Sequence, residues 1–286
     1  MLTFWDLQCI MLLTTFPTSQ KGRKNMLTSE RQRLIREEAI KKGEVTIPDM
    51  AKKFNVSIET IRRDINIMCE KNLIKKVHGG AIPIQFPIRE DTYDIRCAQN
   101  KSEKFAICNY IARNLISDNE SIAITSGSTM EMLADMITGR NLIIVTNSIN
   151  VATILQNRIR QNAISGEVIM LGGEIHPDER YTIGAIAIEM IKRFTFSKVF
   201  FSASAIDGND IMSSNMGEGL IISSILQHAQ FKCLAVDTSK FNIRSTYACA
   251  SLSEIDAIVT EENPNLTEAL TSDFDAAGVE WHKVSV

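Results

Sequence analysis

The 286-residue chain is 44% hydrophobic and 23% charged, and its formal net charge is −3. This length and apolar fraction predict an ordinary soluble globular protein with one small and one large domain. The charge is unevenly distributed, because residues 29–80 hold twelve Lys or Arg against eight Asp or Glu, whereas residues 81–286 carry −9. A basic head on an acidic body indicates a protein that binds a polyanion at one end only.

Residues 1–25 are expected to be an N-terminal extension. Their apolar portion, residues 10–16, is too short to span a bilayer, and its basic residues follow the apolar run, whereas a signal peptide has them before it. We therefore expect neither an export signal nor a membrane anchor. Met26 begins a segment just ahead of the first expected helix, and our hypothesis is that the native protein starts there.

The next segment has the pattern of a helix-turn-helix. A helix is expected over residues 29–42 and ends at Gly43, and a short helix over 48–54 is followed by Asn55, which suits a turn. A third helix, the recognition helix, should follow Ser57, which can cap it by accepting a hydrogen bond from a first-turn backbone N–H. Such a recognition helix presents its DNA-contacting side chains from its opening turns. The candidates are Ser57, Thr60, Arg62 and Arg63.

A basic, glycine-ended segment follows the recognition helix and predicts a wing. Residues 73–77 should form one strand of the wing, and Gly79 with Gly80 permits its tight turn. The side chains expected to reach flanking phosphates or the minor groove are Lys75, Lys76 and His78. Residues 26–81 are thus predicted to be a winged helix-turn-helix DNA-binding domain, because cap, turn, helix and wing agree.

Residues 82–100 contain prolines and alternating charges, which are typical of a linker. From residue 101 to 286 helices and strands alternate, which predicts an α/β domain with a mainly parallel sheet covered on both faces. Strands are expected at residues 121–125, 142–146, 168–171, 198–202, 233–236 and 257–260.

Polar and glycine residues recur where these strands end, which is the edge at which such sheets bind ligands. The loop of residues 126–129 lies between a strand and a helix N-terminus, where free N–H groups and the helix dipole favour an anion such as phosphate. The cation of Lys240 could close over that phosphate. The candidate residues are Ser126, Gly127, Ser128, Thr129, Asn147, Gly172, Gly173, Asp207, Asp237 and Lys240.

The cysteines and histidines show no metal-binding pattern. The six cysteines are scattered, without a Cys-x-x-Cys pair or a nearby histidine, and this argues against a zinc site and a disulfide framework. It also favours a reducing cytoplasm. We expect no metal site and no cofactor.

Residues 56–64 and 77–81 resemble the winged helix-turn-helix of the DeoR family of bacterial transcription regulators. The large domain resembles that family's sensor domain, since residues 126–129, 145–148, 171–173, 182–184 and 237–241 carry its motifs in order. The resemblance implies a fold similar to ribose-5-phosphate isomerase and a phosphorylated sugar or sugar-derived effector on the 126–129 loop. It also adds Glu218 to the candidate effector residues. The chain departs from the family pattern at Thr125, where an acidic residue is common, and at Ile222, where a basic one is.

The sequence therefore predicts a DNA-binding regulator, a repressor of a carbohydrate uptake or catabolism operon, that acts as a homodimer or homotetramer on a double-stranded operator. Which arginine contacts a base, and whether the protein represses or activates, both stay open at this level. The alternative is a sugar-phosphate isomerase-like enzyme with an appended DNA-binding module, for which Glu218, Asp207 or Asp237 could be the general base. Against it, residues 208–215 contain one acidic residue, Asp210, and no lysine.

Overall fold

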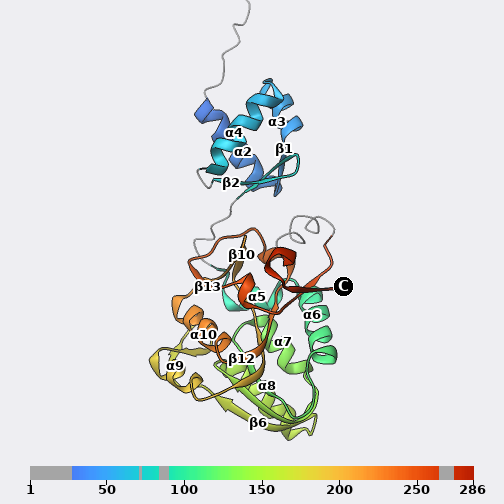
Figure 1. Ribbon diagram of the computed structural model, residues 1–286, viewed down its shortest axis with the longest axis vertical. Helices are drawn as coiled ribbons and strands as arrows, with labels where there is room; N and C mark the ends of the chain where they lie inside the picture. Colours follow the sequence, from blue (N-terminus) through green and yellow to red (C-terminus); the bar gives the residue numbers. More distant parts are fainter. Residues whose placement is uncertain (1–27, 71–72, 84–89, 264–273) are drawn as a thin grey trace, which may run out of the picture. The chain divides into compact units, whose positions relative to one another are not determined.

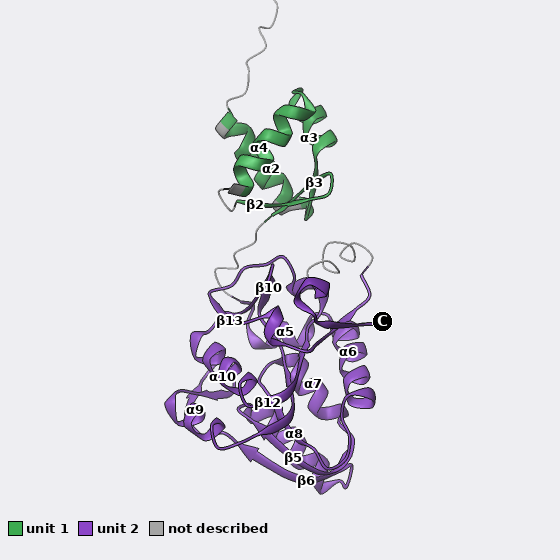
Figure 2. Ribbon diagram, viewed as in Figure 1, with its two compact units in different colours: residues 1–83 green, residues 84–286 purple. Residues whose placement is uncertain are grey.

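The computed structural model describes residues 28–70, 73–83, 90–263 and 274–286 (Figure 1). The chain forms two compact units, residues 1–83 and 84–286 (Figure 2). The extension of residues 1–25, the proposed start at Met26 and residues 84–89 of the expected linker lie outside the described residues. Among the residues that are described, no helix has the length and apolar character needed to cross a bilayer.

Unit 1 contains three helices and a three-stranded antiparallel sheet of order β1-β3-β2 within its described residues. In chain order these are α2 (Thr28–Lys42), β1 (Val45–Thr46), α3 (Ile47–Phe54), α4 (Ile58–Glu70), β2 (Ile74–Val77) and β3 (Gly80–Pro83). The buried face of α4 carries Ile61, Ile65 and Met68 at helical spacing, all fully buried against the other helices and the sheet. The expected helix, turn, helix and wing are all present.

Local signals set the boundaries of these elements. Asn55 ends α3 in the left-handed conformation, at φ 52°, and so turns the chain toward α4. Gly79 has φ 80°, which a glycine adopts without strain, and it forms the turn of the wing. Gly80 packs against backbone, because a Cβ there would lie 2.1 Å from the Val45 carbonyl oxygen.

The core of unit 1 also contains a buried ion pair. The Arg31 Nε lies 2.5 Å from Asp64 Oδ2, and both side chains are almost fully buried. The Gln32 side-chain amide donates to the other Asp64 oxygen at 3.2 Å. Asp64 therefore faces inward from α4 and fastens that helix to α2.

Unit 2 is built on a seven-stranded parallel sheet of order β15-β14-β12-β9-β4-β5-β6. Its strands are β4 (Ser121–Ile124), β5 (Gly139–Thr146), β6 (Ile164–Met170), β9 (Phe196–Phe201), β12 (Ala229–Ala235), β14 (Ala257–Glu261) and β15 (Glu280–Val284). One core packs against α6 (Lys101–Asn114), α7 (Ser128–Met136) and α8 (Ile149–Arg160), and the other against α9 (Ala185–Ile191) and α10 (Met216–Leu226). The doubly covered α/β sheet expected from the alternating pattern is confirmed.

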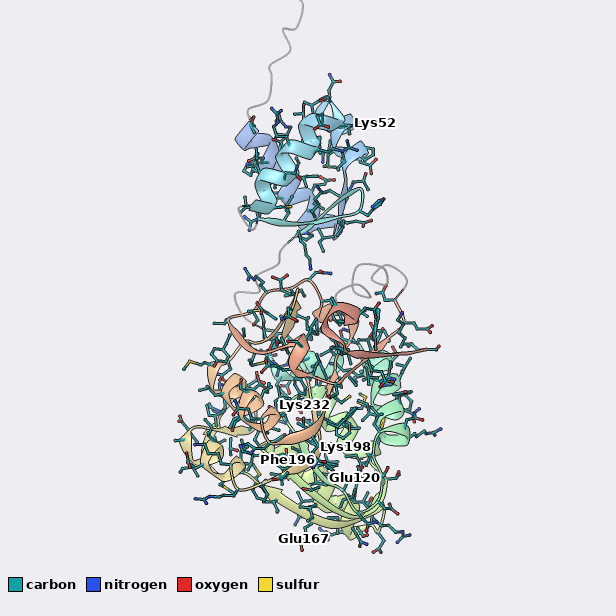
Figure 3. All side chains as sticks on the ribbon, in the orientation of Figure 1. Lys52, Glu120, Glu167, Phe196, Lys198 and Lys232 are labelled. Carbon is teal, nitrogen blue, oxygen red and sulfur yellow. The ribbon has the colours of Figure 1, made fainter. Side chains whose placement is uncertain are left out.

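Side chains of β9 illustrate how this sheet is buried. Phe196 and Phe200 are completely buried, whereas Lys198 extends to pair with Glu120 at 2.5 Å (Figure 3). The ammonium of Lys198 also donates to the Leu115 carbonyl at 2.8 Å.

Unit 2 also contains elements that the sequence pattern did not indicate. These are the antiparallel sheet β10 (Ala205–Asp207), β11 (Asp210–Ser213) and β13 (Tyr247–Ser251), and the hairpin of β7 (Glu174–His176) and β8 (Tyr181–Ile183). Helix α5 (Tyr93–Ala98) lies within the segment expected to be a linker. It is held in unit 2 because the buried Tyr93 donates its hydroxyl to Glu131 and accepts from the Asn150 amide at 2.8 Å.

Candidate functional site

The N-terminal turn of α4 presents the expected DNA-contacting side chains. The backbone N–H of Thr60 donates to Ser57 Oγ at 3.1 Å, so Ser57 caps the helix as predicted. The Arg62 and Arg63 side chains are exposed, and Arg62 is 60% accessible with only a loose 3.6 Å approach to Glu59. This face is therefore open to a partner, while the opposite face of the helix is core.

The wing adds its basic side chains next to this helix. Lys76 on β2 donates from Nζ to the Asn66 side-chain oxygen on α4 at 3.0 Å. His78 is exposed at the turn before β3, and Lys75 is half-buried on β2. Helix and wing of unit 1 thus form one polar, mainly basic surface.

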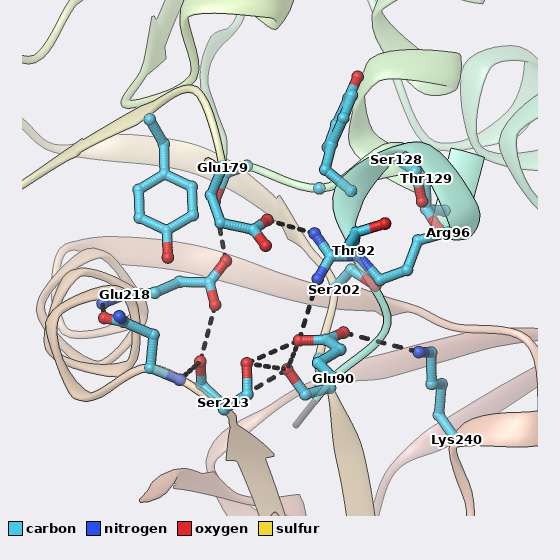
Figure 4. Close-up of a pocket in the computed structure, with 18 of the residues that line it drawn as sticks. Glu90, Thr92, Arg96, Ser128, Thr129, Glu179, Ser202, Ser213, Glu218 and Lys240 are labelled. Atoms are coloured by element: carbon cyan, nitrogen blue, oxygen red, sulfur yellow. Dashed lines mark hydrogen bonds and ion pairs between the residues drawn. The ribbon is translucent and has the colours of Figure 1, made fainter. Parts of the chain in front are cut away.

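Unit 2 contains a cavity of about 700 Å³ at the carboxyl ends of the central strands (Figure 4). Seven of the residues expected to contact an effector line it: Ser126, Gly127, Ser128, Thr129, Glu218, Asp237 and Lys240. Gly127 is the N-cap of α7 with φ 115°, and, having no side chain, it makes no capping hydrogen bond to the helix. The first-turn N–H groups of α7 are consequently available to an anion in the cavity.

Four other candidates are not brought to the cavity: Asn147, Gly172, Gly173 and Asp207. Asn147 is buried, and its amide donates to the Thr182 carbonyl at 3.2 Å. A Cβ on Gly173 would lie 2.4 Å from the Ile183 carbonyl oxygen, so this glycine permits close backbone packing. Asp207 ends β10 in the separate antiparallel sheet and pairs with Arg244 at 2.9 Å.

A buried lysine that was not predicted from the sequence lies beside the 126–129 loop. Lys104, on the first turn of α6, is only 4% exposed, and its Nζ donates to Ser128 Oγ at 3.1 Å and to the Arg96 carbonyl at 2.5 Å. Burial lowers the pKa of this lysine, and the nearby Asp237 carboxylate opposes that effect. Together, Lys104 and the start of α7 form an electropositive end of the cavity.

Carboxylates and cations alternate along the rest of the cavity wall. Arg96 pairs with Glu90 at 3.2 Å and with Glu179, and Lys240 approaches Glu90 at 3.8 Å (Figure 4). Neither Glu90 nor Arg96 was a candidate, because both lie in the expected linker. The sequence feature that could have indicated Glu90 and Arg96 is the high density of charged residues around a single tyrosine at residues 89–96.

Two family models match the chain. The model described as DeoR C terminal sensor domain matches residues 99–262, and the model described as DeoR-like helix-turn-helix domain matches residues 31–85. The chain belongs to the DeoR family. It is accordingly a DNA-binding transcription regulator, and no finding favours the isomerase alternative.

Relatives of this DeoR-family regulator include proteins named as lactose phosphotransferase system repressors. One, from Staphylococcus epidermidis, is 30% identical over 227 residues, which cover 78% of this chain and 88% of that protein. Another, from Streptococcus mutans, is 28% identical over 77% of this chain and 87% of that protein. A solved ribose-5-phosphate isomerase in complex with phospho-erythronic acid matches 50% of this chain and 55% of its own length at 14% identity. Its TM-score is 0.35, which is too low to support a conclusion about function.

Glu218 of the DeoR-family regulator lies at the start of α10 and points into the cavity wall. Ser126 Oγ donates to Glu218 Oε1 at 2.9 Å, and Ser213 Oγ donates to Oε2 at 2.7 Å. Burial raises the pKa of Glu218, and the two serine hydrogen bonds only partly offset that rise. Glu218 therefore links the 126–129 loop to α10.

Proposed function

We propose that this DeoR-family protein represses genes for carbohydrate uptake or catabolism, and that a phosphorylated sugar or sugar-derived metabolite releases it from its operator. The observation that carries the proposal is the combination, in one chain, of an exposed arginine pair on a capped recognition helix and a separate cavity with an electropositive end. The names of the relatives support the class of genes.

On DNA, one of Arg62 and Arg63 contacts a base edge and the other contacts a phosphate. The planar guanidinium of arginine suits both kinds of contact. Ser57 and Thr60 contact backbone or base beside them. The wing residues Lys75, Lys76 and His78 reach the flanking phosphates. A homodimer or homotetramer in the cytoplasm places two recognition helices in successive major grooves.

In the cavity, the effector phosphate lies against the N-terminal turn of α7 and the Lys104 ammonium. Gly127 supports this position, because it has no side chain to cover the N–H groups and its positive φ exposes them. Lys240 closes from the opposite side. Release from DNA requires about 1 to 3 kcal/mol of coupling between the two sites.

We propose that the cavity binds its ligand without turnover. Of the three carboxylates considered as a general base, Asp207 lies outside the cavity. Asp237 Oδ1 accepts from the Asn100 amide at 2.8 Å and from the Ser239 N–H at 3.2 Å, which holds it as the cap of the 3₁₀ helix Thr238–Lys240. Turnover of ribose 5-phosphate by the purified protein would contradict this part of the proposal.

The test begins with duplexes that the full-length protein selects from a randomised DNA pool. Binding to the selected duplex is then titrated in a gel-shift assay against a panel of sugars and their phosphate esters. We expect one or two phosphate esters to release the duplex and their unphosphorylated parents to leave it bound. Failure to select any duplex would refute DNA binding, and release by an unphosphorylated sugar alone would refute the phosphate position.

A further inference from the structure

Glu90 is the first described residue after the boundary between the two units, and its carboxylate lies in the cavity of unit 2. Its Oε2 accepts from Ser204 Oγ at 2.8 Å and from Ser214 Oγ at 2.6 Å. The guanidinium of Arg96 and the ammonium of Lys240 face the same carboxylate at 3.2 and 3.8 Å (Figure 4). Four donors from three parts of the chain thus converge on one carboxylate of a residue near the unit boundary.

This carboxylate is shielded from solvent and nevertheless charged. The Glu90 side chain is 19% exposed, and Arg96 is 11% exposed. Burial opposes ionisation of Glu90, but the Arg96 charge, the Ser214 hydrogen bond and Lys240 together hold its pKa below the usual 4.5. Glu90 is therefore an anion at neutral pH, and the donors around it are organised to hold one.

The same kinds of donor can hold the oxygens of another small anion. Charged hydrogen bonds from arginine and lysine, together with hydroxyl donors, are the usual means of holding a phosphate or carboxylate group. We name these donors the Glu90 site; its members are Arg96, Lys240, Ser204 and Ser214. Lys240 also closes over the proposed phosphate position, whereas Arg96, Ser204 and Ser214 are distinct from the electropositive end formed by Lys104 and α7.

We propose that the Glu90 site is a further anion-binding position of the effector cavity, that Glu90 fills it as an internal ligand in the ligand-free protein, and that a phosphate or carboxylate group of the effector displaces it. The inference rests on the proposed function, since it assumes that the cavity takes an effector. Glu90 follows the end of unit 1 by only a few residues. Displacing its carboxylate therefore changes how the chain leading to the DNA-binding unit is anchored, and this gives the effector a route to the operator-bound state.

The test compares three variants of the full-length protein, two at Glu90 and one control. Glu90→Gln keeps the size of the side chain and can still bond to the serines, but it removes the competing charge. Glu120→Gln is the matched control, because Glu120 is similarly buried at 15% exposure and pairs with Lys198 at 2.5 Å without lining the cavity. A second variant, Glu90→Asp, keeps the charge and retracts it, so the site stays testable if Glu90→Gln does not fold.

The first readout is stabilisation by inorganic phosphate, and by acetate in parallel, in thermal denaturation at constant ionic strength. Removing one charged internal competitor should lower the half-saturating concentration of at least one anion about tenfold in Glu90→Gln. A smaller decrease is expected in Glu90→Asp and no change in Glu120→Gln. An unchanged value in both Glu90 variants, or an equal change in the control, would overturn the Glu90 site; the anion that responds identifies which group displaces Glu90.

The second readout is affinity for a duplex that the wild-type protein selects from a randomised pool, measured without added anion. We expect Glu90→Gln to bind that duplex several-fold more weakly than wild type and Glu120→Gln to match wild type. Wild-type affinity in Glu90→Gln would refute the route to the operator-bound state. If wild type selects no duplex, the proposed function fails by itself, and the anion titration still decides the Glu90 site.

Discussion

Units 1 and 2 assemble their candidate functional residues in different ways. In unit 1 these residues lie close together in the chain, on one helix and the adjoining hairpin, and local signals such as the Ser57 cap place them. In unit 2 the cavity combines side chains from as far apart as Glu90 and Lys240, and tertiary contacts place them. Exposed residues of a local motif are therefore predictable from their spacing, whereas the residues of a cavity depend on which strand ends meet.

The largest expected effect tests whether unit 1 acts independently of the cavity. Replacing Arg62 and Arg63 together with Ala should weaken binding to a selected duplex by about 4 kcal/mol, because a base-edge contact is worth about 1 to 3 kcal/mol and a charged hydrogen bond to phosphate about 1.5 to 3 kcal/mol. Gel-shift titration measures the loss. The control replaces Lys192 and Arg193, an exposed basic pair beside α9, and should bind normally. Phosphate stabilisation of unit 2 should be unchanged in both variants, and a loss of it alongside DNA binding would show that the two units do not act independently.

The second prediction separates a residue that stabilises the helix-turn-helix from the residues of that motif that contact DNA. Asp64→Ala should lower the free energy of unfolding of unit 1 by about 3 kcal/mol, since it removes one partner of a buried ion pair. Chemical denaturation followed by circular dichroism should then show unit 1 unfolding before unit 2. Glu37→Ala removes the exposed pair with Arg33 and should change stability by less than about 0.5 kcal/mol. Equal stability of the two variants would mean that the Arg31–Asp64 ion pair does not hold α2 and α4 together.

The third effect concerns Lys104, which the sequence did not single out. Lys104→Met keeps the length of the buried side chain and removes its charge, so the half-saturating phosphate concentration should rise about tenfold. Thermal denaturation with and without phosphate measures this. Lys232→Met removes an ammonium of unit 2 that does not line the cavity and should not change the response. If phosphate stabilises Lys104→Met as it does wild type, the electropositive end of the cavity is not the phosphate position.

The smallest effect is a trend with pH at Glu218. Because burial raises its folded-state pKa, its contribution to stability is greatest at acid pH and is lost as pH rises from the ordinary value of 4.5 through the folded-state pKa. Glu218→Gln lacks this loss, so the stability of the variant relative to wild type should increase with pH in that window. Denaturation at a series of pH values tests it, and a constant difference would show that the carboxyl is not perturbed.

The parts of the fold that the sequence predicted depend on neighbouring residues. Asn55, Ser57 and Gly79 each act within a few positions, and the alternation of helices with strands was enough to predict the doubly covered sheet. The short strands β7, β8, β10 and β11 were not found, because three or four residues show no usable period. The sheet edge strand β15 has a polar and aromatic sequence, Glu-Trp-His-Lys-Val, that does not resemble a buried strand.

The cavity shows the same limit. The 126–129 loop was predictable, because a strand end followed by a helix start is visible in the sequence. Asp207 also follows a strand-like run, but the chain continues there into an antiparallel sheet, which takes its carboxylate away from the cavity. Glu90 and Arg96 could not be found, because a polar segment with prolines resembles a linker until Tyr93 docks against Glu131 and Asn150.

The burial of Lys104 has a consequence for the lifetime of the protein in the cell. Burial of this ammonium, only partly offset by the Asp237 carboxylate, weakens the folded state, and an anion that binds beside it strengthens the folded state. Proteases act on the small unfolded fraction, which shrinks as the bound fraction grows. We therefore expect the regulator to be degraded more slowly when the proposed effector is abundant, so that the cellular amount of the protein rises with that effector.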